Sequence, residues 1–238
     1  MSGKEKRIIA LDYSSQEEAL ALVGILGEEA TYYKVGMELF YSSGGDIVRH
    51  LKAAGKKVFL DLKLHDIPNT AAKGLGALTR LGADMLNVHA SGGLEMMRRA
   101  GEVVAEEALR CGMQAPVVLA VTVLTSIGGD EWERLGHGEP VNKAVLRLAQ
   151  LTQEAGLQGV VASPQEAAAI RQACGKDFAI VTPGIRPAGV SVDDQQRVAT
   201  PASALSAGAS HLVIGRPVTK AENPLAALRR LAAEMEGA

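Results

Sequence analysis

The sequence predicts an α/β fold, and within that class a closed (β/α)8 barrel, or TIM barrel, that residues 1–238 form as a single domain. Three observations predict it. Short apolar runs alternate along the chain with segments of helical spacing. The length of 238 residues suits one barrel. Hydrophobic residues make up 47% of the chain and aromatic residues only 3%, so the core is expected to be aliphatic, as in parallel sheets covered by helices.

Eight apolar runs are the expected strands. They are Ile8–Leu11, Tyr32–Val35, Val58–Leu62, Met85–Val88, Val117–Val121, Gly159–Ala162, Phe178–Val181 and His211–Ile214. Good helix formers at helical spacing lie between them, as in residues 16–26 and 144–154. Alternation of strand and helix implies parallel strands with right-handed crossovers. A doubly wound open sheet is the main alternative, because a strand count from one sequence can be wrong by one or two.

Several helix ends are readable. Ser15 stands three residues before Glu18, which is a capping-box spacing. Gly55 and Gly82 follow helical runs, where a left-handed residue is needed. Pro164 and Pro224 fall near helix starts, where the missing N–H is tolerated.

Composition excludes several classes of protein. The net charge is −2, from 25 basic and 27 acidic residues, so no broad positive field attracts polyanions. Scarce aromatic residues also argue against nucleic-acid binding. Cys111 and Cys174 lack metal-type spacing and are expected to be free thiols. No apolar run approaches a signal peptide or a membrane span, so we expect a cytoplasmic protein without a membrane partner.

Charged residues stand at the ends of the first three expected strands. Asp12 ends the first, Lys34 lies in the second, and Asp61 and Lys63 end the third. Side chains alternate along a strand, so Asp61 and Lys63 are expected to share the inward face at one mouth of the barrel. A strand-end charge that reaches solvent is an equal alternative for Asp12. Exposure to solvent is a weaker alternative for Asp61 and Lys63, because two opposite charges on an inward face are costly to bury unless they are paired.

Asp66 adds a carboxylate just beyond the third strand. The order Lys34, Asp61, Lys63, Asp66 would alternate in sign, and such an array holds each lysine protonated and each aspartate ionised. An ammonium group is a proton donor. A lysine that forms a Schiff base must instead be neutral, with few carboxylates nearby.

Two later loops pair a glycine with an arginine. They are Thr182–Pro187 and Ile214–Pro217, after the seventh and eighth strands. The loops after these strands often form the phosphate site of a barrel, where glycine amides and an arginine hold the anion. Ordinary turn glycines with surface arginines are the alternative, and two such pairs in the two expected loops favour phosphate binding.

Other motifs are absent from the sequence. It has no Walker A motif, dinucleotide fingerprint, His-Glu-x-x-His or nucleophile elbow. His65 and His89 lie near strand ends, where they are metal ligands or structural histidines, and we favour the structural role. We therefore expect neither a metal nor a cofactor.

These residues resemble the orotidine 5′-phosphate decarboxylase family. The resemblance runs from Ile8–Asp12 through Tyr33–Gly36 and Asp61–Thr70 to the two phosphate loops, and so covers essentially the whole chain. Related sugar-phosphate decarboxylases share Asp-x-Lys-x-x-Asp, whereas the extension His65–Thr70 together with Lys34 is more specific. The resemblance implies cofactor-free decarboxylation of orotidine 5′-phosphate to UMP and CO2 in pyrimidine biosynthesis.

The resemblance also implies the roles of single residues. Lys63 protonates C6 of the pyrimidine, Asp61 faces the substrate carboxylate, and Lys34 and Asp12 hold the ribose. Asp66 and Thr70 enter the site of a neighbouring subunit in a homodimer, and Ile67 is a further substrate-binding residue. The remaining substrate contacts are Thr125 and Ser126 at the pyrimidine, Arg186, Gly215 and Arg216 at the phosphate, and Gln195, or its neighbour Gln196, closing over both.

Three other functions stay open. A metal-dependent sugar-phosphate decarboxylase or synthase of the same superfamily has an acidic residue where this chain has Lys34. A Schiff-base aldolase needs an unpaired lysine. A non-catalytic phosphate-sensing barrel is expected to have lost at least one of Asp61, Lys63 and Asp66, and all three are present.

Overall fold

Eight parallel strands close into a barrel in the computed structural model, which describes residues 3–187 and 199–236. The strands are β1 (Arg7–Leu11), β2 (Tyr32–Gly36), β3 (Lys57–Leu64), β4 (Met85–His89), β5 (Val117–Val121), β6 (Gly159–Val161), β7 (Ala179–Thr182) and β8 (His211–Ile214). Each strand pairs with its neighbour in sequence, and β1 pairs with β8, as Ile9 with Ile214. The predicted closed barrel is confirmed, and the open sheet is excluded.

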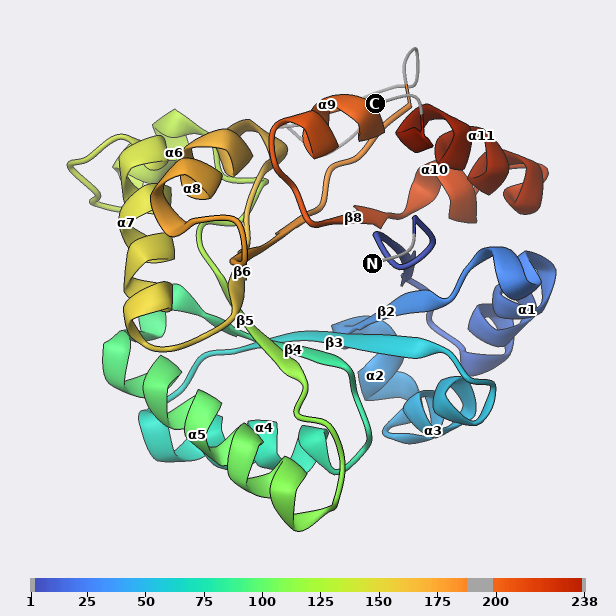
Figure 1. Ribbon diagram of the computed structural model, residues 1–238, viewed down its shortest axis with the longest axis horizontal. Helices are drawn as coiled ribbons and strands as arrows, with labels where there is room; N and C mark the ends of the chain where they lie inside the picture. The colour runs from blue at the N-terminus through green and yellow to red at the C-terminus, as the bar shows by residue number, and fades with distance from the viewer. Residues whose placement is uncertain (1–2, 188–198, 237–238) are drawn as a thin grey trace.

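Helices surround the strands on the outside (Figure 1). They are α1 (Gln16–Leu26), α2 (Met37–Ser43), α3 (Asp46–Ala53), α4 (Pro68–Thr79), α5 (Leu94–Arg110), α6 (Gly129–Arg134), α7 (Val141–Glu154), α8 (Ala167–Cys174), α9 (Pro201–Ser206), α10 (Arg216–Thr219) and α11 (Pro224–Glu236). Short 3-10 turns cover Gly27–Glu29, Ala90–Gly92 and Pro164–Glu166. No helix in the described part of the chain is long and apolar enough to cross a membrane.

The predicted helix ends are found where the sequence places them. The Ser15 hydroxyl accepts a hydrogen bond from the N–H of Glu18, which is half of the expected capping box. Gly55 and Gly82 have φ angles of +69° and +84°, which a side chain would make unfavourable. Pro164 and Pro224 each begin a helical segment.

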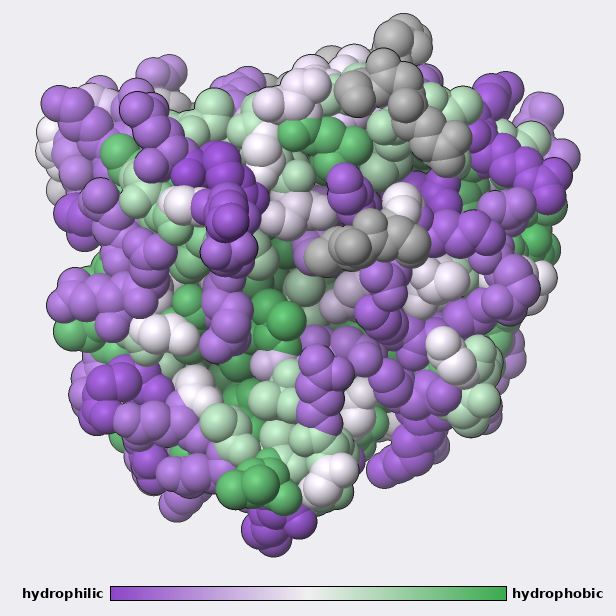
Figure 2. Space-filling model, viewed as in Figure 1, coloured by the Kyte–Doolittle hydropathy of each residue, from purple (hydrophilic) through white to green (hydrophobic). Residues whose placement is uncertain are grey.

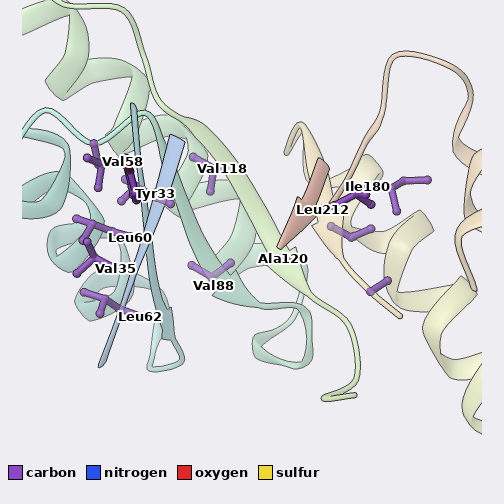
Figure 3. Packing of buried hydrophobic residues seen from close by; sticks show 14 of the residues in the cluster. Tyr33, Val35, Val58, Leu60, Leu62, Val88, Val118, Ala120, Ile180 and Leu212 are labelled. Carbon is purple, nitrogen blue, oxygen red and sulfur yellow. The ribbon is translucent and has the colours of Figure 1, made fainter. Parts of the chain in front are cut away.

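The strands bury two separate layers. Alternate side chains such as Tyr33, Val58 and Leu60 point outward and pack in the large core under the helices (Figure 3). The other set fills the barrel interior and consists of Ile8, Ala10, Tyr32, Phe59, Met85, Leu119, Val181 and Val213. Figure 2 shows hydrophobic surface near the middle of one face, with hydrophilic side chains along its rim. The charged residues lie directly above this interior layer, at one end of the barrel.

His211 is a buried histidine at the start of β8, where it meets Tyr32 edge to face. Burial, reinforced by the nearby Lys57 ammonium, lowers the pKa of His211 from 6.5 to about 4. The unfolded chain therefore binds more protons than the folded chain between pH 6.5 and pH 4. Stability is expected to fall as the pH falls through this window.

We predict that a His211→Leu variant loses less stability on acidification than the unsubstituted protein. Between pH 7 and pH 5 the difference in the free energy of unfolding is expected to be about 2 kcal/mol, because one pKa unit corresponds to about 1.4 kcal/mol. Urea unfolding at both pH values measures it, with substitution of the exposed His50 by leucine as the control. An equal loss in His211→Leu and the unsubstituted protein would contradict the prediction.

Candidate active site

The charged residues predicted at the strand ends meet at one mouth of the barrel. Asp12 directly follows β1, Lys34 lies in β2, and Asp61 and Lys63 lie toward the end of β3. Lys34 pairs with Phe59 in the sheet and Gly36 pairs with Asp61, so Lys34 lies two positions deeper in the barrel than Asp61 and on the same face. The carboxyl ends of barrel strands are where functional groups collect.

The four side chains form a continuous chain of ion pairs, called here the charged array: Asp12, Lys34, Asp61 and Lys63. Nζ of Lys34 lies 3.0 Å from Oδ1 of Asp12 and 3.4 Å from Oδ2 of Asp61. Nζ of Lys63 lies 2.7 Å from Oδ1 of Asp61. The signs alternate as predicted, but Asp12 rather than Asp66 is the second carboxylate within one chain.

Neighbouring charges outweigh the effect of burial in the centre of the array. Burial alone disfavours the charged form of Asp61, but the ammonium groups of Lys34 and Lys63 lower the pKa of this carboxyl below its usual value. Burial likewise disfavours the ammonium of Lys34, yet the carboxylates of Asp61 and Asp12 raise the pKa of Lys34 above its usual value. Both groups are therefore charged at neutral pH.

The backbone at Lys63 differs from the regular strand that the alternation rule assumes. Lys63 has φ +51° and is the one non-glycine residue in the left-handed region among those the structure describes. The pairing of β3 with β4 shifts register between Leu60 and Leu64. Asp61 and Lys63 still meet on one side, but a bulge with a left-handed residue brings them together rather than simple alternation.

Asp66, Ile67 and Thr70 lie outside the charged array of their own chain. All three are exposed between β3 and the first turn of α4. The Asp66 carboxylate accepts a hydrogen bond from the N–H of Ile67 at 2.7 Å. The assignment of Asp66 and Thr70 to the site of a neighbouring subunit, and of Ile67 to substrate binding, stays a prediction.

The charged array opens onto a pocket of about 310 Å³, within the range of small-molecule sites. Its lining combines Asp12, Lys34, Asp61, Lys63, Thr125, Ser126, Arg186, Gly215 and Arg216 with apolar residues of the barrel interior and loops. The pocket therefore brings together the predicted site residues from the ends of six strands, β1, β2, β3, β5, β7 and β8. Gln195 and Gln196 lie outside the described residues.

The two glycine–arginine loops form one side of this pocket. Gly184 has φ +76° and turns the chain after β7, and the buried Arg186 follows it. The N–H of Arg186 donates to the carbonyl of Ala199, and the N–H of Ala199 donates to the carbonyl of Gly184. Gly215 directly follows β8, and Arg216 begins α10 at the pocket wall. Arginines beside a helix start are suited to an anion.

His65 and His89 lie together beside the array, with ring centroids 5.4 Å apart. Burial, with help from the neighbouring His65 and Lys63, lowers the pKa of His89 below 6.5. Within residues 3–187 and 199–236, no group of three or more His, Cys, Asp or Glu side chains is arranged to hold a metal ion.

Two residues of the site escaped the sequence prediction. Asn87 in β4 contacts both Asp61 and Lys63. The signal in the sequence was an amide within the apolar run Met85–Val88, two positions after the inward Met85. A methyl group at Gly36 would lie 3.1 Å from Nζ of Lys34, so this glycine leaves room for the pair with Asp12.

Fold and pocket together define a class of protein, the (β/α)8 barrel enzymes with a charged site at the carboxyl ends of their strands. Within that class, residues 6–231 match the family described as "Orotidine 5'-phosphate decarboxylase / HUMPS family". The chain belongs to this family.

Individual relatives agree with the family match. The chain is 52% identical to the orotidine 5′-phosphate decarboxylase of Moorella thermoacetica, over 99% of this chain and 94% of that protein. It is 51% identical to the enzyme of that name from Nitrosococcus oceani, over 98% of both. The crystal structure of orotidine 5′-phosphate decarboxylase from Lactobacillus acidophilus superposes with a TM-score of 0.85 at 39% identity, covering 96% of this chain and 97% of that one.

Proposed function

We propose that the chain is an orotidine 5′-phosphate decarboxylase that releases UMP and CO2 in pyrimidine biosynthesis without a cofactor, with residues 1–238 as one catalytic domain. The observation that carries the proposal is that the charged array and the two glycine–arginine loops line a single pocket. Relatives of that name at about half identity over nearly the whole chain support it.

The array suits a reaction that leaves negative charge on a ring carbon. When the bond between C6 and the carboxylate breaks, CO2 leaves and the electron pair stays on C6. The Lys63 ammonium stabilises this carbanion and then donates its proton to C6, and solvent returns a proton to the lysine. Asp61 faces the substrate carboxylate, and Lys34 and Asp12 hold ribose hydroxyls.

One ammonium group cannot account for the whole lowering of the activation barrier. Enzymes lower barriers by roughly 8–23 kcal/mol, and this reaction belongs to the upper part of that range. Phosphate held by Arg186, Gly215 and Arg216 contributes binding energy that orients the base, while Thr125 and Ser126 meet the pyrimidine. The remote phosphate thus helps the chemistry at the ring.

A metal-dependent sugar-phosphate decarboxylase or synthase of the same superfamily is the nearest alternative. The position that is acidic in such proteins is Lys34 here, and its ammonium lies between two carboxylates. A cation at that position opposes a bound divalent metal ion. Lys34 therefore favours the decarboxylase.

We also propose a homodimer with two composite sites. Asp66, Ile67 and Thr70 are exposed and do not line their own pocket, and Ile67 is 68% exposed. Apolar side chains from the adjoining strand–helix units are exposed as well: Met37, Tyr41 and Leu94. An exposed apolar surface of this kind favours a partner subunit.

We further propose a cytoplasmic location, with no nucleic-acid or membrane partner.

Lys63→Ala is expected to abolish turnover while nucleotide binding stays measurable, because the proton donor is lost and the phosphate contacts remain. Loss of orotidine 5′-phosphate absorbance measures turnover, and calorimetry measures binding of UMP. Lys57→Ala, at the opposite end of β3, is the matched control and should keep full activity. A chelator should leave the unsubstituted enzyme unaffected. Normal turnover by Lys63→Ala would refute the assigned role.

Arg216→Ala is expected to weaken binding of the phosphorylated substrate far more than binding of the bare nucleoside. A charge-assisted contact contributes about 1.5–3 kcal/mol, which is roughly 10- to 150-fold in affinity. Arg229→Ala, on the surface of α11, is the control. Equal losses for nucleotide and nucleoside would mean that the phosphate lies elsewhere.

Mixing Asp66→Ala with Lys63→Ala chains should restore activity that neither variant has alone. In a mixed dimer one site receives both natural residues and the other receives neither. Random assembly of equal amounts therefore gives about one quarter of normal activity. Coexpression followed by the absorbance assay tests this, and mixed samples as inactive as the separate variants would exclude composite sites.

A further inference from the structure

Asn87 occupies the inward face of β4 next to the charged array. It is 1% exposed, and its strand neighbours Leu86 and Val88 pack outward in the main core. A buried primary amide is costly unless its donors and acceptor are used. Its position therefore calls for partners, and both of those found belong to β3.

The amide holds the two residues at the centre of the array at once. Its Nδ2 donates to Oδ1 of Asp61 at 2.7 Å, and its Oδ1 accepts from the backbone N–H of Lys63 at 2.8 Å. The same Oδ1 of Asp61 also receives the Lys63 ammonium at 2.7 Å. Asp61, Asn87 and Lys63 thus form a closed hydrogen-bonded ring.

The ring lies where the sheet itself does not hold the chain. Leu60 pairs with Leu86 and Leu64 pairs with Val88, so three residues of β3 lie opposite Asn87 alone. Lys63 sits in this bulge with φ +51°, a left-handed conformation that is unfavourable for a residue with a side chain. The Asn87 side chain provides the hydrogen bond that a regular ladder would otherwise give to Lys63.

We propose that Asn87 is a positioning residue: its one amide fixes both the Asp61 carboxylate and the main chain of Lys63, and so sets where the ammonium meets the reacting carbon. This inference rests on the proposed function for its consequence in catalysis. The hydrogen bonds themselves do not depend on it.

Asn87→Ala tests both contacts together. Its kcat for orotidine 5′-phosphate should fall about 100-fold, the effect of roughly 1 Å of misplacement, with KM changed less than about threefold because the phosphate contacts stay. Thr152→Val is the matched control, since it removes a buried hydroxyl that donates to the Leu148 carbonyl in α7, away from the site. A kcat within threefold of normal in Asn87→Ala, or an equal loss in Thr152→Val, would overturn the proposal.

Asn87→Asp separates the two contacts and keeps the size of the side chain. The new carboxylate still accepts from the N–H of Lys63 but repels Asp61 until it is protonated, when its hydroxyl can donate. Its kcat should therefore rise as the pH falls, whereas Asn87→Ala shows no such rise. The titratable groups around position 87 are Asp61 and Lys63 on β3, Lys34 behind them on β2, and the pair His65 and His89. They are present in both variants, so identical pH profiles would overturn the proposal.

Amide hydrogen exchange at residue 63, followed by NMR, distinguishes this inference from the proposed function. The N–H of Lys63 should exchange faster in Asn87→Ala and stay protected in Asn87→Asp, whatever the enzyme acts on. Failure of the unsubstituted protein to turn over orotidine 5′-phosphate would refute the proposed function alone. Unchanged exchange in Asn87→Ala would refute the positioning role alone.

Discussion

The arrangement of charged residues at the mouth of the barrel depends on the ion pairs and the hydrogen bond of the Asp61 carboxylate. It is buried, and a buried carboxylate without partners would take up a proton. Two ammonium groups and one amide prevent this, and each partner is held in place in return. Lys34 lies between Asp61 and Asp12, so the charged array has equal numbers of positive and negative charges. This balance makes a dense group of charges compatible with an aliphatic barrel.

Much of the fold and part of the site could be predicted from residue order because a strand has a period of two. The interior positions of Ile8, Ala10 and Phe59 follow from that period, as does the inward direction of Asp61. The loops after β7 and β8 could also be assigned to the pocket wall, because a closed barrel brings every strand end to the same mouth.

The remaining features of the site depend on contacts between strands, and no local sequence pattern encodes these contacts. A bulge between Leu60 and Leu64 reflects the register of β3 against β4, and the left-handed Lys63 follows from it. The partners of Asn87 likewise depend on that register, because both of them lie on β3. Asp12 replaced Asp66 as the second carboxylate within one chain for the same reason, because sequence distance does not measure separation across a sheet.

Because β8 pairs with β1, the barrel can close only after its last strand has been synthesised. The array residues precede residue 64, whereas Gly215 and Arg216 come close to the end of the chain. Chains emerge from the ribosome amino end first, so the lysines and aspartates are made long before the loop that completes their pocket. Val213 packs with Ile8 and Ala10 in the barrel interior, so the layer beneath the array is complete only when β8 is in place. A chain that has not yet reached β8 therefore lacks both the last interior residue of the barrel and the second glycine–arginine loop of the pocket.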